Sequence, residues 1–107
     1  MREGDTLPTV EKHVTQARID RYAEASGDFN PIHIDEAFAA ESQFGGTIAH
    51  GMLVAAAISE VMSSAFGLDW LESGRLKLRF RAPVFPGDMI TAYGTVTAVR
   101  EGEAVCS

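Results

Sequence analysis

The stretch ASGDFNPIHIDEAFAAESQFGGTIAHGMLVAAAI, residues 25–58, decides how the rest of the chain is expected to fold. It places a turn with titratable side chains shortly before GMLVAAAI, residues 51–58, the most apolar run in the sequence. We predict a helix that begins between Thr47 and Gly51 and ends near Phe66. Because its first half is apolar on all sides, this helix is expected to be buried. Polar, titratable groups in a turn beside a buried helix are typical of acid–base sites.

The residues before this stretch indicate one weak strand and one helix. Residues 6–14, TLPTVEKHV, have the composition of an edge strand, since Pro lacks the N–H that a central strand needs. Thr15 can cap a helix over residues 16–26, in which apolar side chains recur on one face. Asp35 can cap a second, shorter helix that ends before Gly45.

The residues after the long helix change to a period of two, which is typical of half-buried strands. RLKLRFR at 75–81 alternates cations with apolar residues, PVFPGD at 83–88 predicts a turn, and MITAYGTVTAV at 89–99 predicts a returning strand. A third strand begins at residues 104–106. A hydrophobic helix followed by antiparallel strands indicates an α+β fold, with an antiparallel sheet around a long central helix. We expect residues 1–107 to form a single domain.

Composition excludes several classes of protein. The formal net charge of −6 argues against nucleic-acid and anionic-membrane partners. The single cysteine, Cys106, leaves no internal disulfide and fits a reducing compartment. The opening MREGDTLPTV has no apolar core of signal-peptide length, and residues 51–58 are far shorter than the ~20 residues that cross a bilayer. We therefore expect a cytoplasmic protein without a membrane partner.

Asp28 and His33 are the first candidate catalytic residues. They lie five residues apart across the Asn30-Pro31 turn, so their side chains can meet at one point. Histidine is suited to proton transfer near neutral pH, and a carboxylate can hold a water molecule. The spacing alone leaves a second interpretation open, in which Asp28 closes the turn and His33 bonds to backbone. Asn30 is expected to stabilise the turn through its side-chain amide.

His50 and Gly51 lie at the predicted start of the long helix. Free N–H groups and the helix dipole there favour a developing negative charge, such as that of a thioester enolate. Glycine also lets a ligand approach the backbone closely. The alternative is a helix N-terminus that contains glycine for other reasons. Ser59, about two turns along the same helix, is a weaker candidate for a pocket residue.

A metal site is the alternative from a different chemical class. His33, Asp35 and His50 resemble the two-histidine, one-carboxylate ligand set of non-haem iron sites. No eight-strand barrel pattern surrounds these residues, so we expect no metal. Stoichiometric iron or zinc in the purified protein would reverse this expectation.

Four of the nine basic residues lie within seven positions, at Arg75, Lys77, Arg79 and Arg81. The common interpretation of such a pattern is the solvated face of a strand. The alternative is a surface that binds a phosphorylated carrier, since arginine and lysine bind phosphate.

Three motifs together resemble the MaoC-like (R)-specific enoyl-CoA hydratases and dehydratases. They are SGDFNPIH at 26–33, F-x-x-x-I-A-H-G-M at 44–52 and FRAPVFPGD at 80–88. The resemblance extends from about Gly4 to Val105 and implies a hot-dog fold. It also implies that a trans-2-enoyl-CoA is hydrated to the (R)-3-hydroxyacyl-CoA, and that the reverse dehydration occurs, with no metal or redox cofactor.

By position, the resemblance assigns the catalytic pair to Asp28 and His33, which hold the water. It assigns the backbone N–H for the thioester carbonyl oxygen to Gly51, and supporting positions to Asn30 and Ser59. It further implies a homodimer or higher oligomer. Acyl-chain length would depend on the pocket floor, for which the candidates are Met52, Ala55, Ala56 and Phe66.

Two alternatives remain open within the resemblance. One is a 3-hydroxyacyl-carrier-protein dehydratase of fatty-acid synthesis, which would use the same residues. The other is a non-catalytic hot-dog subunit of a heteromeric dehydratase. Family members usually continue through further strands, whereas this sequence stops at Ser107. We expect either a fragment of a longer protein or a short sheet whose open edge another chain covers.

Overall fold

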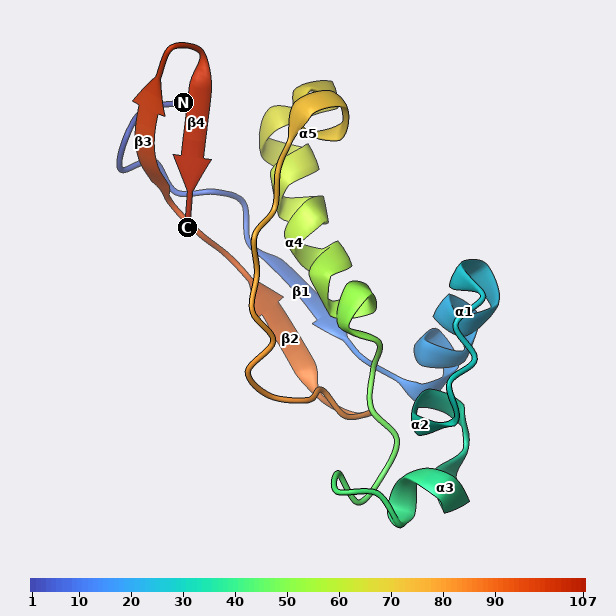
Figure 1. The fold of residues 1–107 in the computed structure, drawn as a ribbon. Coiled ribbons are helices and arrows are strands. Elements are labelled where there is room, and N and C mark those ends of the chain that lie inside the picture. Colours follow the sequence, from blue (N-terminus) through green and yellow to red (C-terminus); the bar gives the residue numbers. More distant parts are fainter. The chain divides into compact units, whose positions relative to one another are not determined.

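The computed structural model describes residues 1–107. Figure 1 shows its helices and strands, which follow one another along the chain in this order: β1 Val10–His13, α1 Gln16–Ser26, α2 Pro31–Ile34, α3 Glu36–Ala40, α4 Gly51–Phe66, α5 Leu68–Ser73, β2 Met89–Ala92, β3 Val96–Arg100 and β4 Glu103–Cys106. The strands pair as two two-stranded sheets, β1 with β2 and β3 with β4. The α+β class is confirmed, but the expected single sheet is present as two strand pairs.

The chain folds as two compact units. The first unit comprises Met1–Glu11, Ala57–Leu76 and Thr91–Ser107, and the second comprises Lys12–Ala56 and Lys77–Ile90. Each unit has its own apolar core. The candidate catalytic residues belong to the second unit.

The core of the second unit forms where the apolar face of α1 is buried. Val14, Ile19 and Ala49 form a buried cluster, and partly buried Leu53, Val54, Val84 and Ile90 pack against it. The helix limits follow the sequence prediction. The Thr15 hydroxyl accepts the Arg18 N–H at 3.2 Å, and Gly27, at φ 77°, donates its N–H to the Ala23 carbonyl. Glycine suits that left-handed position because it has no Cβ.

Two short helices follow, each begun by a polar cap. The Asn30 side-chain oxygen accepts the Ile32 N–H at 3.1 Å, and the Asp35 carboxylate accepts the Phe38 N–H at 3.1 Å. The predicted capping by Asp35 is confirmed, although α3 ends at Ala40 rather than near Gly45. The helical turn α2 was not predicted. Pro31 occupies its first position, where a missing N–H costs nothing.

The predicted turn at residues 83–88 is confirmed. The Asp88 carboxylate accepts the Phe85 N–H at 2.9 Å, and Gly87 has φ 99°. Val14 fixes the turn from outside, since its N–H bonds to the Asp88 carbonyl and its carbonyl accepts the Gly87 N–H. The turn is thereby held next to the end of β1.

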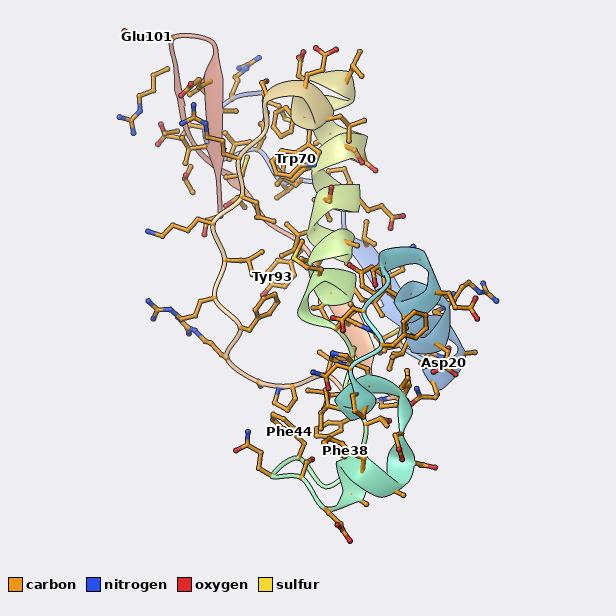
Figure 2. All side chains as sticks on the ribbon, turned by 45° about the vertical axis from the view of Figure 1, so that its right-hand side comes forward. Asp20, Phe38, Phe44, Trp70, Tyr93 and Glu101 are labelled. Atoms are coloured by element: carbon orange, nitrogen blue, oxygen red, sulfur yellow. The ribbon has the colours of Figure 1, made fainter.

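In the first unit the β3–β4 hairpin is antiparallel, with Ala98 opposite Val105 and Arg100 opposite Glu103. Glu101 lies at the tip of the hairpin with φ 49°, and the C-terminus ends beside its base (Figures 1 and 2). Leu7, Val61 and Val96 form the buried core of this unit. Trp70 of α5 lies against α4, where its indole N–H donates to the Ser59 hydroxyl at 2.9 Å (Figure 2).

Two strand predictions are wrong. Residues 75–81 are not a strand, because they form no backbone ladder with another segment and a strand requires a hydrogen-bonded neighbour. Residues 89–99 are not one strand, since β2 ends at Ala92 and β3 begins at Val96. Neither interruption is encoded in the local alternation of apolar and polar residues.

Helix α4 begins at Gly51 and ends at Phe66, as predicted. Its burial differs from the prediction. Ala55 and Ala57 are buried, whereas Met52 is 61% exposed. An apolar run without a polar face cannot indicate which side remains open. No helix in the chain combines the length and apolar character needed to cross a membrane.

Candidate functional site

A pocket of about 240 Å³ lies at the start of α4, within the second unit. It contains five residues that the sequence predicted, namely Asp28, His33, His50, Gly51 and Met52. Three further lining residues, Tyr22, Ser26 and Phe80, were not predicted. Tyr22 and Ser26 belong to α1, and Phe80 belongs to the segment misassigned as a strand. The pocket is about large enough for the reacting part of a ligand rather than for a whole cofactor-sized molecule.

Asp28 follows α1 in a turn that fixes its backbone. Its N–H donates to the Ser26 hydroxyl at 3.2 Å, and its Oδ1 accepts the Asn30 N–H at 3.2 Å. Oδ2 has no partner within the chain, and the residue is exposed. The turn interpretation and the catalytic interpretation are therefore compatible, because one carboxylate oxygen closes the turn and the other is free to hold a ligand.

His33 is oriented by the backbone of residue 48. Its Nδ1 lies 2.8 Å from the Ile48 carbonyl oxygen. A carbonyl oxygen can only accept, so this contact assigns the hydrogen of the ring to Nδ1. In the neutral ring Nε2 then keeps a free lone pair. That is the form in which histidine accepts a proton or a hydrogen bond from water.

Gln16 holds His33 through its main chain, and no sequence signal singled it out. Its side-chain N–H group donates to the His33 carbonyl at 2.8 Å and to the Asp20 carboxylate at 2.8 Å. Its side-chain oxygen accepts the hydroxyl of buried Thr47 at 2.7 Å. Only a long-range contact in three dimensions reveals this role.

His50 is 3% exposed and contacts both catalytic candidates. Its Nε2 lies 3.0 Å from the Asp28 carbonyl oxygen, and its ring stacks on that of His33 with centroids 3.8 Å apart. The Tyr22 ring also packs against the His50 ring, and the two ring centroids are 4.8 Å apart. Nδ1 of His50 is buried without a hydrogen-bond partner.

The residues that could form a metal site differ from the predicted set. Asp35 caps α3, and Asp28 instead joins the histidines: one oxygen of Asp28 and one nitrogen each of His33 and His50 lie within 4.8 Å of one another. The two rings are stacked with centroids 3.8 Å apart and an interplanar angle of 24°, so their in-plane lone pairs lie in two separate, nearly parallel planes. Two imidazoles so placed do not fit a common ion at the ~2.0–2.1 Å of a metal–nitrogen bond.

Gly51 is the first residue of α4, and its N–H forms no hydrogen bond within the chain. The helix dipole makes this free N–H a favourable site for negative charge. The absence of a side chain has a structural reason as well. A Cβ built on Gly51 would lie 2.8 Å from Cζ of the Phe80 ring, so this ring occupies the space beside the helix start.

The remaining predicted residues lie outside the lining of this pocket. Ser59 belongs to the other unit, where its hydroxyl accepts the Trp70 N–H. Ala55 is 2% exposed and Ala56 is exposed, and neither lines the pocket. Asn30 caps α2 and thereby supports His33. Roles in substrate binding for Ser59, Ala55 and Ala56 stay predictions.

Comparison with known proteins agrees with the three motifs. The family described as MaoC like domain matches residues 2–106. An (R)-specific enoyl-CoA hydratase of Aeromonas caviae is 38% identical over 99 residues, which cover 92% of this chain and 73% of that enzyme. A mitochondrial 3-hydroxyacyl-[acyl-carrier-protein] dehydratase of Arabidopsis thaliana is 37% identical over 102 residues, covering 94% of this chain and 59% of that protein.

The fold agrees with that of solved relatives. The structure of the (R)-hydratase from A. caviae involved in PHA biosynthesis matches with a TM-score of 0.73 at 35% identity, covering 99% of this chain and 81% of that one. The predicted hot-dog fold is therefore confirmed.

Proposed function

Because the chain belongs to the MaoC-like domain family, we propose that it adds water across the double bond of a trans-2-enoyl-CoA thioester. The product is the (R)-3-hydroxyacyl-CoA, and the same site catalyses the reverse dehydration. Relatives that are more than a third identical to this chain over the aligned residues carry hydratase and dehydratase names.

One observation supports this proposal most directly. A carboxylate with a free oxygen, a histidine whose free lone pair is on Nε2, and a free helix N-terminal N–H line the same pocket. An oxygen of Asp28 and a ring nitrogen of His33 lie within 4.8 Å, which one water can bridge with two hydrogen bonds of about 2.8 Å. Such a water donates both hydrogens and presents its lone pairs to the substrate.

The reaction then needs no redox change. The water oxygen bonds to C3 of the enoyl group while the Asp28–His33 pair takes one of its protons. The π electrons move towards the thioester oxygen, where the Gly51 N–H and the helix dipole stabilise the negative charge. The Asp28–His33 pair then returns its proton to C2, where these electrons form the C–H bond, so one water has been added and the pair is regenerated. The two residues act as one proton-transferring unit.

Hydration of crotonyl-CoA tests the proposal. Purified protein is expected to remove the enone absorbance, and chiral analysis is expected to give the (R)-3-hydroxy product. Formation of the (S) product, or an absence of hydration by correctly folded protein, would contradict it.

A second candidate activity is dehydration of a 3-hydroxyacyl group on acyl carrier protein, favoured by the Arabidopsis relative. The residues would have the same roles, and only the carrier differs. Matched CoA and carrier-protein thioesters of one acyl chain distinguish the two, since the physiological carrier gives the higher kcat/KM.

The proposal includes a cytoplasmic homodimer. The unpaired segment at residues 75–81 exposes 42% of Leu76 and 55% of Phe80, although its sequence alternates like a strand. Exposed apolar residues on an unpaired segment favour a partner chain. Light scattering at micromolar concentration is expected to give twice the chain mass of 11.5 kDa, whereas a monomer over the whole concentration range would contradict the dimer.

A further inference from the structure

We infer that His50 is a positioning residue, which fixes the backbone of Asp28 and the ring plane of His33 without transferring a proton itself. This inference rests on the proposed function. It adds a role for a residue that the sequence indicated as part of a helix start or, alternatively, as a metal ligand.

The His50 ring is hydrogen-bonded through Nε2 to the main chain of Asp28. Nε2 is 3.0 Å from the Asp28 carbonyl oxygen, and because that oxygen only accepts, Nε2 carries the hydrogen. Nδ1 is buried without a partner. A hydrogen there would be a buried donor with nothing to accept it, which is costlier than an unused lone pair. The N–H at Nε2 is therefore committed to the Asp28 carbonyl.

The second step concerns the face of the ring. The His33 ring lies on the His50 ring at 3.8 Å and 24°, while its own Nδ1 is held by the Ile48 carbonyl. One hydrogen bond leaves a ring free to rotate about that bond. A flat neighbour removes this freedom, so stacking and hydrogen bond together set the direction of His33 Nε2.

The third step concerns the support of His50 itself. Tyr22 packs on it at 4.8 Å with an interplanar angle of 57°, and the residue is 3% exposed. The ring of His50 thus contacts Tyr22, His33 and the main chain of Asp28. A rigid ring between two catalytic groups is the arrangement by which a residue outside the chemistry controls their geometry.

Two substitutions separate the hydrogen bond from the ring. His50→Gln keeps an N–H at nearly the position of Nε2 and loses the flat ring, whereas His50→Phe keeps the ring and loses the donor. Each is expected to lower kcat by about 10- to 100-fold with KM changed less than about threefold, because displaced catalytic groups affect turnover more than binding. His50→Leu, which lacks both features, is expected to lose more than either.

The third histidine supplies the control. His13→Gln changes an exposed residue of β1 outside the pocket and is expected to leave kcat and KM unchanged. Variants with parental circular dichroism and parental kcat at position 50 would overturn the inference. A rise in KM at constant kcat would also overturn it, since His50 would then be a binding group.

A readout independent of activity separates this inference from the proposed function. Nitrogen NMR of the ring is expected to show His33 with its hydrogen on Nδ1 in both proteins, and exchange broadening of its Nε2 signal in His50→Leu only, because without the stacked ring His33 can rotate about its hydrogen bond to Ile48. An equally sharp His33 Nε2 signal in His50→Leu would reject the positioning role even if the parent proved not to be a hydratase. If His50→Leu does not fold, the same comparison is made with His50→Gln.

Discussion

At the scale of single residues, Gly51 is constrained from two sides. Its free N–H is the proposed site for the thioester oxygen, and the Phe80 ring fills the space where a Cβ would be. The sequence indicated the first constraint through the helix start. It gave no indication of the second, because Phe80 lies 29 positions further along the chain.

Gly51→Ala is therefore expected to affect activity more than stability. The new methyl would meet Cζ, the far end of a Phe80 side chain that is 55% exposed and can move away. We expect a loss of at most about 1 kcal/mol in the free energy of unfolding, the low end for an added methyl. Alanine keeps the backbone N–H, so we expect kcat/KM to fall, by up to about 10²-fold, only because the methyl group and the displaced Phe80 ring hinder the approach of the thioester oxygen to that N–H.

Stopped-flow hydration and urea unfolding measure the two effects. Gly46→Ala, in open space, is the matched control and should change neither. Full activity of Gly51→Ala would show that catalysis does not require the close approach to the backbone that a glycine at this position allows.

Cys106 offers a prediction about pH at the same scale. It packs against the core of Leu7, Val61 and Val96, and this burial raises its pKa. Since the thiolate is the reactive form, alkylation by iodoacetamide at pH 9 should be slower in folded than in urea-unfolded protein. Equal rates in the two states would contradict the burial of the thiol.

The raised pKa of Cys106 also makes the stability of the folded protein depend on pH. The folded pKa of Cys106 lies above the unfolded one, so its stabilising contribution is complete below the unfolded pKa. It is lost as pH rises through the folded value. Cys106→Ser should therefore lessen the fall in stability at alkaline pH.

At the scale of elements, the helical turn α2 is what brings His33 to the pocket. Asn30 caps it, and Pro31 occupies its first position. Asn30→Ala is expected to cost about 0.5–2 kcal/mol of stability by removing the cap, and to lower kcat because α2 carries His33. Asn30→Ser, which preserves a capping oxygen, is the control and should retain most of both. Thermal unfolding and steady-state kinetics measure the two effects. An Asn30→Ala variant with parental kcat would show that the cap is not needed for catalysis.

The basic segment at 75–81 gives a prediction about the carrier. The side chains of Arg75, Lys77, Arg79 and Arg81 are exposed and form no ion pair or hydrogen bond. If they attract the phosphates of the substrate, KM for a CoA ester should rise with salt, and less so in Lys77→Ala/Arg79→Ala. Arg100→Ala, an exposed cation on β3, should keep the parental salt dependence. Identical salt dependence in parent and double variant would favour a merely solvated segment.

The elements that the sequence predicted well are those with local causes. Thr15 and Gly27 bound α1 through contacts within four residues, and Asp88 closes its own turn. The failures depend on partners. Residues 75–81 alternate correctly for a strand, yet the chain supplies no neighbour to complete their hydrogen bonds. The break between Ala92 and Val96 likewise has no local signal.

At the scale of the whole molecule, the residues of the candidate site were easier to predict than the residues that support them. Asp28, His33, His50 and Gly51 were predicted, and the structure brings all of them to one pocket. Gln16, Tyr22 and Phe80 were missed, because their contacts join segments far apart in the sequence. Sequence motifs indicate residues that could carry chemistry, whereas the residues that support them are identified only from contacts in the folded structure.

The central claim is that Asp28 and His33 together activate one water molecule. The most direct test is the kcat for hydration of crotonyl-CoA by Asp28→Asn, His33→Ala and the double variant. Each single change is expected to lower kcat by about 10²- to 10⁴-fold, the usual contribution of a general acid–base group. The double variant should be little worse than the more damaging single change, because the residues act as a unit. Folded single variants with parental kcat would contradict the claim.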